Sequence, residues 1–224
     1  MSQRGYALDD GWYLDHAAGA AMTPGQDVLL QAHLEISPAA REQAGAITRI
    51  GGAMLESIDD ADEASLAFDI DDIFARDAGE TPAPDVTAAE ADSKALPDYL
   101  PDAVRTFMAE SHVRLRWEFL GPGLEKAMLW RGGDDERLWL LRARPGVAIP
   151  HHGHRGSELT LVLKGSFYDG DQRYQRGDVE EADPGVEHDI RIGDEGECIC
   201  LALTEGKLRF QDPLLRLFQV FTGL

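Results

Sequence analysis

The stretch GVAIPHHGHRGSELTLVLKG, at positions 146–165, decides the fold of the C-terminal part of the chain. Side chains alternate between two faces along a strand, so His152 and His154 project to one side, and Glu158 joins them after a short kink. A later segment, GDVEEADPGVEH at 177–188, brings a third histidine from another strand. Imidazoles with one carboxylate suit a divalent transition metal. The predicted metal ligands are therefore His152, His154, Glu158 and His188.

The spacing of these residues resembles the first motif of the cupin family, which runs here from Gly146 through the histidine pair to Gly165. The segment at 177–188 resembles the second cupin motif, although Pro184 stands one residue late and Ile192 replaces the usual asparagine. The resemblance implies a jelly-roll barrel around one divalent metal ion. Zinc is the favoured ion, and iron, manganese and nickel stay open. A cupin whose histidines are only structural is the alternative.

Alternating apolar and polar residues support an all-β C-terminal part. Runs at 113–119, 126–131 and 137–143 alternate in this way, and glycine-rich turns separate them. Short strands at such regular spacing predict a closed barrel or a double-sheet domain. His151 falls on the other parity from its neighbour His152, so its side chain should point away from the metal site.

The N-terminal part predicts three short helices, at about 9–20, 25–36 and 39–58. Thr23 and Ser37 each precede a proline, a pattern typical of a capped helix start. Apolar residues then recur at helical spacing and predict a small bundle. The stripe expected to hold this bundle, closed either by Phe68, Ile73 and Phe74 or by a second subunit, consists of Val28, Leu29, Ala32, Ile36, Ile47, Ile50, Met54 and Ile58.

An acidic region separates the two parts: residues 59–98 carry thirteen acids against two bases. Within it, the segment 65–78 reads as a fourth helix of the bundle or, less favoured, as an acidic amphipathic helix that docks on a basic partner. The sequence thus predicts an α+β chain, with a helical bundle at 1–76, a linker at 77–97 and an all-β cupin barrel at 98–224.

The helical part resembles the zinc-binding anti-sigma domain of the ChrR-type anti-sigma factors, which is joined to a cupin in the same order. The resemblance rests on the run at 16–19 and on the segment 28–40, which contains His33, Ser37 and Ala40. It implies that the helices bind a sigma factor of the extracytoplasmic-function type. Of the family's zinc ligands only His33 is matched, because Ser37 and Ala40 occupy the cysteine positions. We therefore expect one metal per chain, and none among the helices.

The charge narrows the range of partners. Forty-one acids against 21 bases give a formal net charge of −20, which argues against direct binding to nucleic acid or an anionic membrane. The chain shows neither a signal peptide nor an 18-residue apolar run, so we expect a cytoplasmic protein. Its two cysteines, Cys198 and Cys200, should lie side by side on one strand face as packing residues rather than as a disulfide or as ligands.

Three functions remain open on the sequence. The favoured one is transcriptional regulation: an anti-sigma factor whose barrel senses a signal through its metal. A metal-dependent cupin enzyme, either a dioxygenase or an isomerase acting on a small molecule, is the alternative, and it is less favoured. The third is a barrel that only binds a small molecule or a metal. The apolar tail at 213–224 should cover a barrel edge, and a homodimer formed through it stays open.

Overall fold

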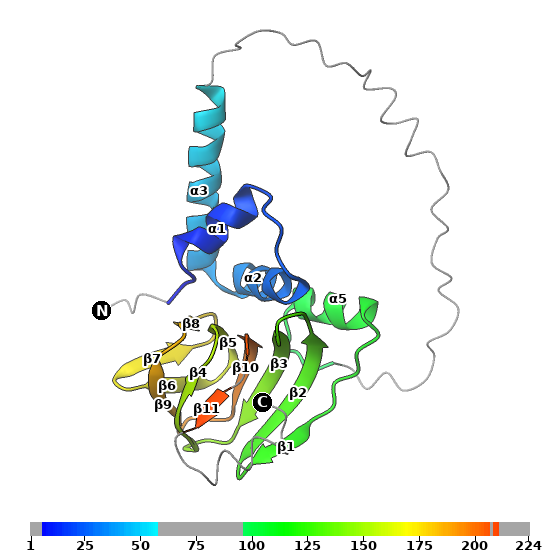
Figure 1. Cartoon of the computed structure of the whole chain (residues 1–224), viewed down its shortest axis with the longest axis vertical. Helices are drawn as coiled ribbons and strands as arrows, with labels where there is room; N and C mark the ends of the chain where they lie inside the picture. Colours follow the sequence, from blue (N-terminus) through cyan, green and yellow to red (C-terminus); the bar gives the residue numbers. More distant parts are fainter. Residues whose placement is uncertain (1–5, 58–95, 207, 211–224) are drawn as a thin grey trace.

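The computed structural model describes residues 6–57, 96–206 and 208–210. Helices occupy the N-terminal part, and two antiparallel sheets face each other in the C-terminal part (Figure 1). The predicted α+β architecture is confirmed. The expected linker at 77–97, apart from its last two residues, lies outside the described residues, as do the expected fourth helix at 65–78 and the tail at 213–224.

Local sequence explains where the N-terminal helices start. The Asp9 side chain accepts a hydrogen bond from the Gly11 amide and caps α1. Thr23 and Gln26 form a reciprocal capping box at the start of α2, and Ser37 caps α3. The helices span Asp10–Ala17 (α1), Pro24–Ile36 (α2) and Pro38–Glu56 (α3).

Among the described residues, the apolar stripe predicted to hold the bundle is buried along α2 and exposed along the second half of α3, while the residues expected to close it at 68–74 lie outside the described part. Val28, Leu29 and Ala32 are buried, whereas Ile50 is 62% exposed and Met54 is 64% exposed. The reason is that α3 projects away from the rest of the described chain beyond its first turns (Figure 1). Ile58, the last residue of the predicted stripe, lies outside the described residues.

The all-β part follows a short helix, α5 (Asp102–Glu110). Its strands start later than expected, because the first of them begins at Glu118 rather than at Val113. The strands are β1 (Glu118–Gly121), β2 (Leu124–Arg131), β3 (Arg137–Ala143), β4 (Ala148–His154), β5 (Glu158–Lys164), β6 (Ser166–Asp169), β7 (Gln172–Gln175), β8 (Val179–Ala182), β9 (Glu187–Ile192), β10 (Cys198–Thr204) and β11 (Leu208–Phe210).

Two sheets build the barrel. One has six strands in the order β1-β2-β3-β10-β5-β8, and the other has five in the order β11-β4-β9-β6-β7. The two motif segments therefore end up in both sheets: β4 and β9 are neighbours in the second sheet, while β5 and β8 are neighbours in the first. This arrangement brings side chains from both motifs into the space between the sheets.

The helices and the barrel share one hydrophobic core. Leu29 and Leu30 of α2 belong to the same buried cluster as Leu201 and Leu203 of β10. A methyl group at Gly25 would lie 2.5 Å from the Leu203 side chain, so the start of α2 rests directly on the strand. The helical part is thus packed on the barrel rather than tethered to it. In the described residues we find no helix long and apolar enough to cross a membrane.

Candidate metal centre

Two predicted ligands meet inside the barrel. His152 of β4 and His188 of β9 are directly opposite each other in the antiparallel register, and each is only 5% exposed. Their Nε2 atoms are 3.2 Å apart. Two nitrogen ligands of one tetrahedral zinc ion, each about 2.0–2.1 Å from the metal, would stand about 3.3 Å apart. The spacing of the two imidazoles fits a shared metal ion.

The other ring nitrogens show which atoms are available to a metal. The Nδ1 atom of His152 is 2.9 Å from the carbonyl oxygen of Pro150, and since a carbonyl only accepts, Nδ1 carries the hydrogen. The Nδ1 atom of His188 faces two carboxylates, which favours a hydrogen there too. Both Nε2 lone pairs then point at each other. A proton or a metal cation between them relieves this repulsion.

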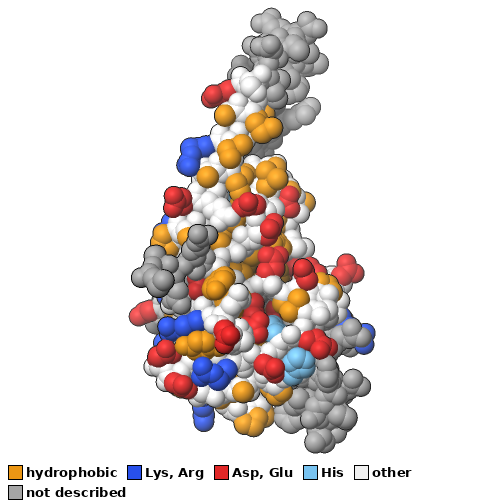
Figure 2. Space-filling model, turned by 90° about the vertical axis from the view of Figure 1, so that its left-hand side faces the viewer, with side chains coloured by type: hydrophobic (Ala, Val, Ile, Leu, Met, Phe, Trp, Pro, Cys, Tyr) orange, Lys and Arg blue, Asp and Glu red, His pale blue; other side chains and the backbone are white. Residues whose placement is uncertain are grey.

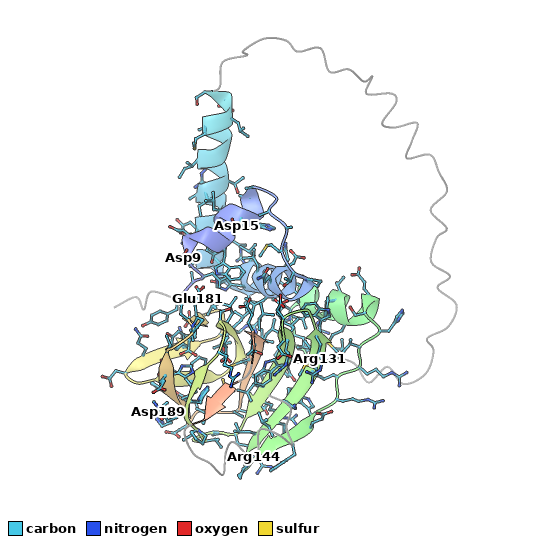
Figure 3. All side chains as sticks on the ribbon, in the orientation of Figure 1. Asp9, Asp15, Arg131, Arg144, Glu181 and Asp189 are labelled. Carbon is cyan, nitrogen blue, oxygen red and sulfur yellow. The ribbon has the colours of Figure 1, made fainter. Side chains whose placement is uncertain are left out.

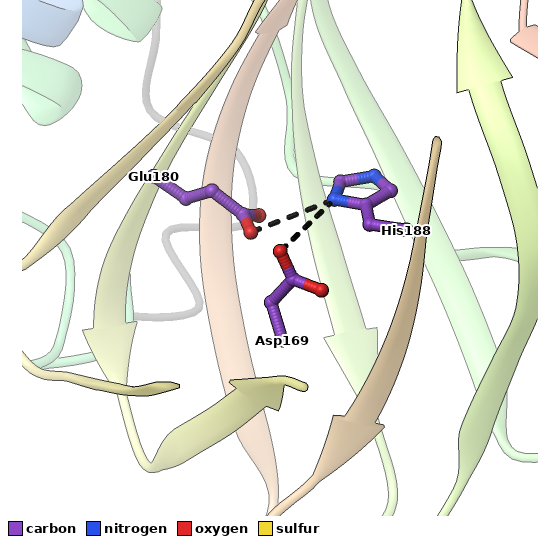
Figure 4. A group of neighbouring side chains, drawn as sticks. All are labelled: Asp169, Glu180 and His188. Atoms are coloured by element: carbon purple, nitrogen blue, oxygen red, sulfur yellow. Dashed lines mark ion pairs between the residues drawn. The ribbon is translucent and has the colours of Figure 1, made fainter. Parts of the chain in front are cut away.

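Two acids hold the far side of the His188 ring. Glu180 of β8 and Asp169 at the end of β6 both point at Nδ1, with oxygens 3.5 Å and 3.8 Å away (Figure 4). Carboxylates in this position orient a metal-binding histidine and strengthen its other nitrogen as a ligand. The three side chains also lie close enough to hold a metal ion themselves, with Nδ1 as the nitrogen ligand. The paired Nε2 atoms favour the first arrangement.

The electrostatics of the interior fit a bound cation. Burial, followed by the charge of His188, lowers the pKa of His152 to about 4, so this imidazole is neutral and able to bind a metal at pH 7. Burial and the charge of Glu180 raise the pKa of Glu158 to about 7. Burial also raises the pKa of Glu180. The raised pKa values of Glu158 and Glu180 mean that a nearby cation would stabilise their ionised forms.

His188 behaves differently from His152. Burial alone would lower its pKa, but Glu180, Glu158 and Asp169 together raise it above the ordinary value. Without a metal, this histidine is therefore the one that holds the proton between the two Nε2 atoms. A metal ion at that position would replace the proton, and metal binding would then release a proton from His188.

The structure places the remaining predicted residues as follows. Glu158 begins β5, and its charge acts on both His188 and Glu180. His154 ends β4, but its side chain lies outside the described part of the structure. His151 lies on the outer face, where its ring nitrogens are 3.2 Å from Glu187 and 3.3 Å from Asp189.

Sequence reasoning missed Asp169 and Glu180. The alternation in β8 predicts that either Glu180 or Glu181 faces the interior, but it does not say which of the two acids does so. Asp169 had no such signal. It sits beside the turn between β6 and β7, and only the pairing of β6 with β9 carries it to His188.

The three helical positions that the sequence resemblance compares with zinc ligands make other contacts in this structure. His33 is fully buried, and its Nε2 atom is 2.9 Å from the hydroxyl oxygen of Tyr13. Ser37 caps α3 by accepting from the amide of Ala40, whose side chain is buried. Gly177 of the barrel packs against the backbone at Ser37. A hydrogen bond to Tyr13, a helix cap and contact with the barrel thus account for the surroundings of these residues.

The two cysteines pack as predicted from their spacing. Cys198 and Cys200 are both buried, neither is in a disulfide, and their Sγ atoms are 3.6 Å apart on one face of β10. They belong to a buried apolar cluster with Val162 and Phe167. The hydrogen bond from Cys198, followed by burial, raises the pKa of the Cys200 thiol well above its usual value, which keeps it protonated.

Comparison with known proteins identifies the family. Residues 107–207 match the family model described as the ChrR cupin-like domain. The anti-sigma-E factor ChrR of Cereibacter sphaeroides is 35% identical over 222 residues, which cover 96% of each chain. The crystal structure of Rhodobacter sphaeroides SigE in complex with the anti-sigma ChrR contains a chain that is 32% identical. That match covers 89% of this chain and 98% of the other, with a TM-score of 0.64. The chain belongs to the ChrR family of anti-sigma factors, with a cupin barrel as its C-terminal part.

Proposed function

We propose that this protein is an anti-sigma factor: its helical part binds a sigma factor, and its barrel holds one divalent transition metal. The family relationship supports the proposal, because a similar chain has been solved in complex with a sigma factor. Since such a partner acts on RNA polymerase, we propose a cytoplasmic location. In this proposal, residues 1–76 bind the sigma factor, residues 77–97 form the linker and residues 98–224 form the barrel.

The observation that carries the proposal is the exposed apolar surface of α3. Ile50 and Met54 stand four residues apart and share one face of the helix, and Leu55 beside them is 70% exposed. Figure 2 shows hydrophobic side chains gathered along this projecting part of the molecule. Contiguous apolar surface on a soluble domain marks an interaction site. A partner that covers α3 would complete the helical part.

The charge of the chain fits this partner. Sigma factors bind DNA through basic surfaces, and a protein with a net charge of −20 complements such a surface. Asp9, Asp15 and Glu181 place acids beside the helices, at the junction with the barrel (Figure 3). Attraction between opposite surfaces mainly accelerates association and weakens as salt rises.

Binding to sigma factors tests the proposal directly. Tagged full-length protein should capture a sigma factor from an extract of its own organism, as identified by mass spectrometry. The Met54→Asp variant should weaken binding to the captured sigma factor about 30-fold or more, since it places a charge in the centre of the interface. Glu56→Gln is the matched control, because two residues along a helix do not share a face. Equal binding by both variants would refute the role of α3.

In the barrel we propose that the metal ligands are His152, His154, Glu158 and His188. The short distance between the Nε2 atoms of His152 and His188 supports this set, as does the raised pKa of Glu158. Zinc is the ion we favour, and when bound it would supply a Lewis acid centre. Asp169 and Glu180 keep the His188 ring in place through its Nδ1 atom. A small-molecule ligand in the barrel and a homodimer stay predictions.

A further inference from the structure

Strand β8 has one side chain inside the barrel and the next one outside. Glu180 is buried and faces His188 at 3.5 Å, whereas the neighbouring Glu181 is exposed on the outer surface. This alternation follows from the pleat of a strand, in which successive side chains point to opposite faces. Glu180 belongs to the candidate metal centre. Glu181 can contact an element that packs on the outside of the barrel at that edge.

The element packed on this edge is the segment that leads into α1, together with α1 itself. The indole Nε1 of Trp12 donates a hydrogen bond to Glu181 at 3.1 Å. The amide of Val179 donates to the carbonyl of Tyr6 at 2.9 Å. In return, the amide of Tyr6 donates to the carboxylate of Asp178 at 3.1 Å. Three hydrogen bonds thus extend the edge of the six-stranded sheet into the N-terminal segment.

The contact continues toward the exposed apolar surface. Helix α1 packs against α3, and Gln43 of α3 donates a hydrogen bond to Asp10 of α1. Gln43 lies two turns before Ile50, in the part of α3 that still packs against the core through Ala44 and Ile47. A continuous chain of contacts therefore runs from His188 through β8 and α1 to the base of the projecting helix.

We propose that β8 couples the barrel metal site to the docking of α1, so that metal occupancy and the placement of the sigma-binding helices depend on each other. The proposal rests on the function proposed above and adds the route. A metal ion at the Nε2 atoms would draw electron density from the His188 ring, and its Nδ1–H would bind the Glu180 carboxylate more tightly. The tighter contact of Glu180 with His188 would reduce the motion of β8. A more rigid β8 would in turn keep α1 docked through the contact of Trp12 with Glu181.

Hydrogen exchange on the full-length protein tests the coupling. Zn²⁺ added to the metal-free protein should slow exchange in peptides from β4 and β9, which flank the site. It should also slow the peptide covering residues 6–18 by about fivefold or more, the lower range of typical couplings between sites. Slowing in β4 and β9 with no change at 6–18 would overturn the coupling and leave the metal site standing.

Variants at the outer contact give a second and independent readout. Trp12→Phe keeps the ring and removes the hydrogen-bond donor to Glu181. Since coupling is reciprocal, it should lower the affinity for Zn²⁺ about threefold to tenfold, as measured by competition with a chelator. Glu181→Gln keeps an acceptor oxygen and should bind Zn²⁺ as the unmodified protein does. Asp15→Asn, which removes a charge from the same junction, controls for simple electrostatics.

The outcomes separate the two proposals. Failure of the unmodified protein to bind any of Zn²⁺, Fe²⁺, Mn²⁺ and Ni²⁺ stoichiometrically would remove the metal centre itself, and with it the proposed function of the barrel. Tight Zn²⁺ binding that is equal in Trp12→Phe and in the unmodified protein would overturn only the coupling, provided that circular dichroism shows the variant folded. If Trp12→Phe unfolds, Glu181→Leu breaks the same contact from the barrel side, and the same fall in affinity is expected.

Discussion

The Nε2 atoms of His152 and His188 face each other at 3.2 Å, while the Nδ1 atom of each ring points at an oxygen acceptor. The two rings are held in tilted contact, with centroids 4.6 Å apart. Neither ring can turn away without leaving its acceptor. We propose that this relationship prepares the interior of the barrel for one cation, and the first prediction tests that proposal.

Single replacement of His152, His188 or Glu158 by alanine should empty the metal site. Each change would remove a proposed ligand from a centre that has few others, and His154→Ala should do the same. Elemental analysis of the purified protein should show about one metal per chain in the unmodified form and a small fraction of that in each variant. His151→Ala is the matched control, because His151 lies outside the barrel. Loss of the metal from His151→Ala alone would mean that the alternation is misplaced by one residue.

Glu180→Gln should weaken metal binding without abolishing it. The amide oxygen can still accept from the Nδ1–H of His188, but the negative charge that strengthens Nε2 as a ligand is lost. Replacement of a carboxylate behind a metal-binding histidine lowers affinity about 10- to 100-fold. Competition with a chelator measures the change. Complete loss of metal would instead indicate that Glu180 binds the ion itself, together with Asp169.

Acid should loosen the helical part through His33. Burial lowers the pKa of His33 to about 4, against an ordinary value of 6.5, and the backbone of Gly177 opposes this only in part. The unfolded chain therefore binds more protons between these values, so stability is full above pH 6.5 and falls as pH drops toward 4. The difference amounts to about 3 kcal/mol. Denaturant unfolding of the metal-free protein should show this slope, and His33→Gln should flatten it.

Thr23 should matter for the docking of α2 on the barrel. Its hydroxyl accepts from the amide of Gln26 and donates to Glu136 at 2.6 Å, so one side chain both caps the helix and ties it to the segment before β3. Thr23→Ala should lower the free energy of unfolding by about 1–2 kcal/mol. Thr23→Ser keeps the hydroxyl and should lose much less. Thermal unfolding of both variants measures the difference.

Sequence alone predicted the architecture well because its signals are local. Thr23 and Ser37 cap helices where the pattern placed them, and the strand at Arg137–Ala143 has the predicted bounds. The opposition of His152 and His188 followed from alternation and from the cupin resemblance together. Asp169 could not be predicted, since it reaches His188 only through the pairing of β6 with β9.

The exposed half of α3 could not be predicted for a related reason. An apolar stripe looks the same in sequence whether it faces a core in the same chain or a partner. Ile47 is partly buried against the shared core, and Ile50 continues the stripe into solvent. Among the described residues, the stripe passes from the core to solvent between Ile47 and Ile50, and nothing in the sequence marks that change. The packing of α2 on the barrel could likewise not be predicted from the sequence, because Gly25, which lies at the contact, has no side chain.

Transcription with purified components tests the central claim most directly. RNA polymerase with the captured sigma factor should start transcripts from a promoter of that sigma factor, and full-length protein added in stoichiometric amount should abolish them. Met54→Asp should inhibit only at a concentration about 30-fold higher or more, whereas Glu56→Gln should inhibit as the unmodified protein does. Transcription that continues undiminished in the presence of excess folded, metal-loaded protein would contradict the assignment as an anti-sigma factor.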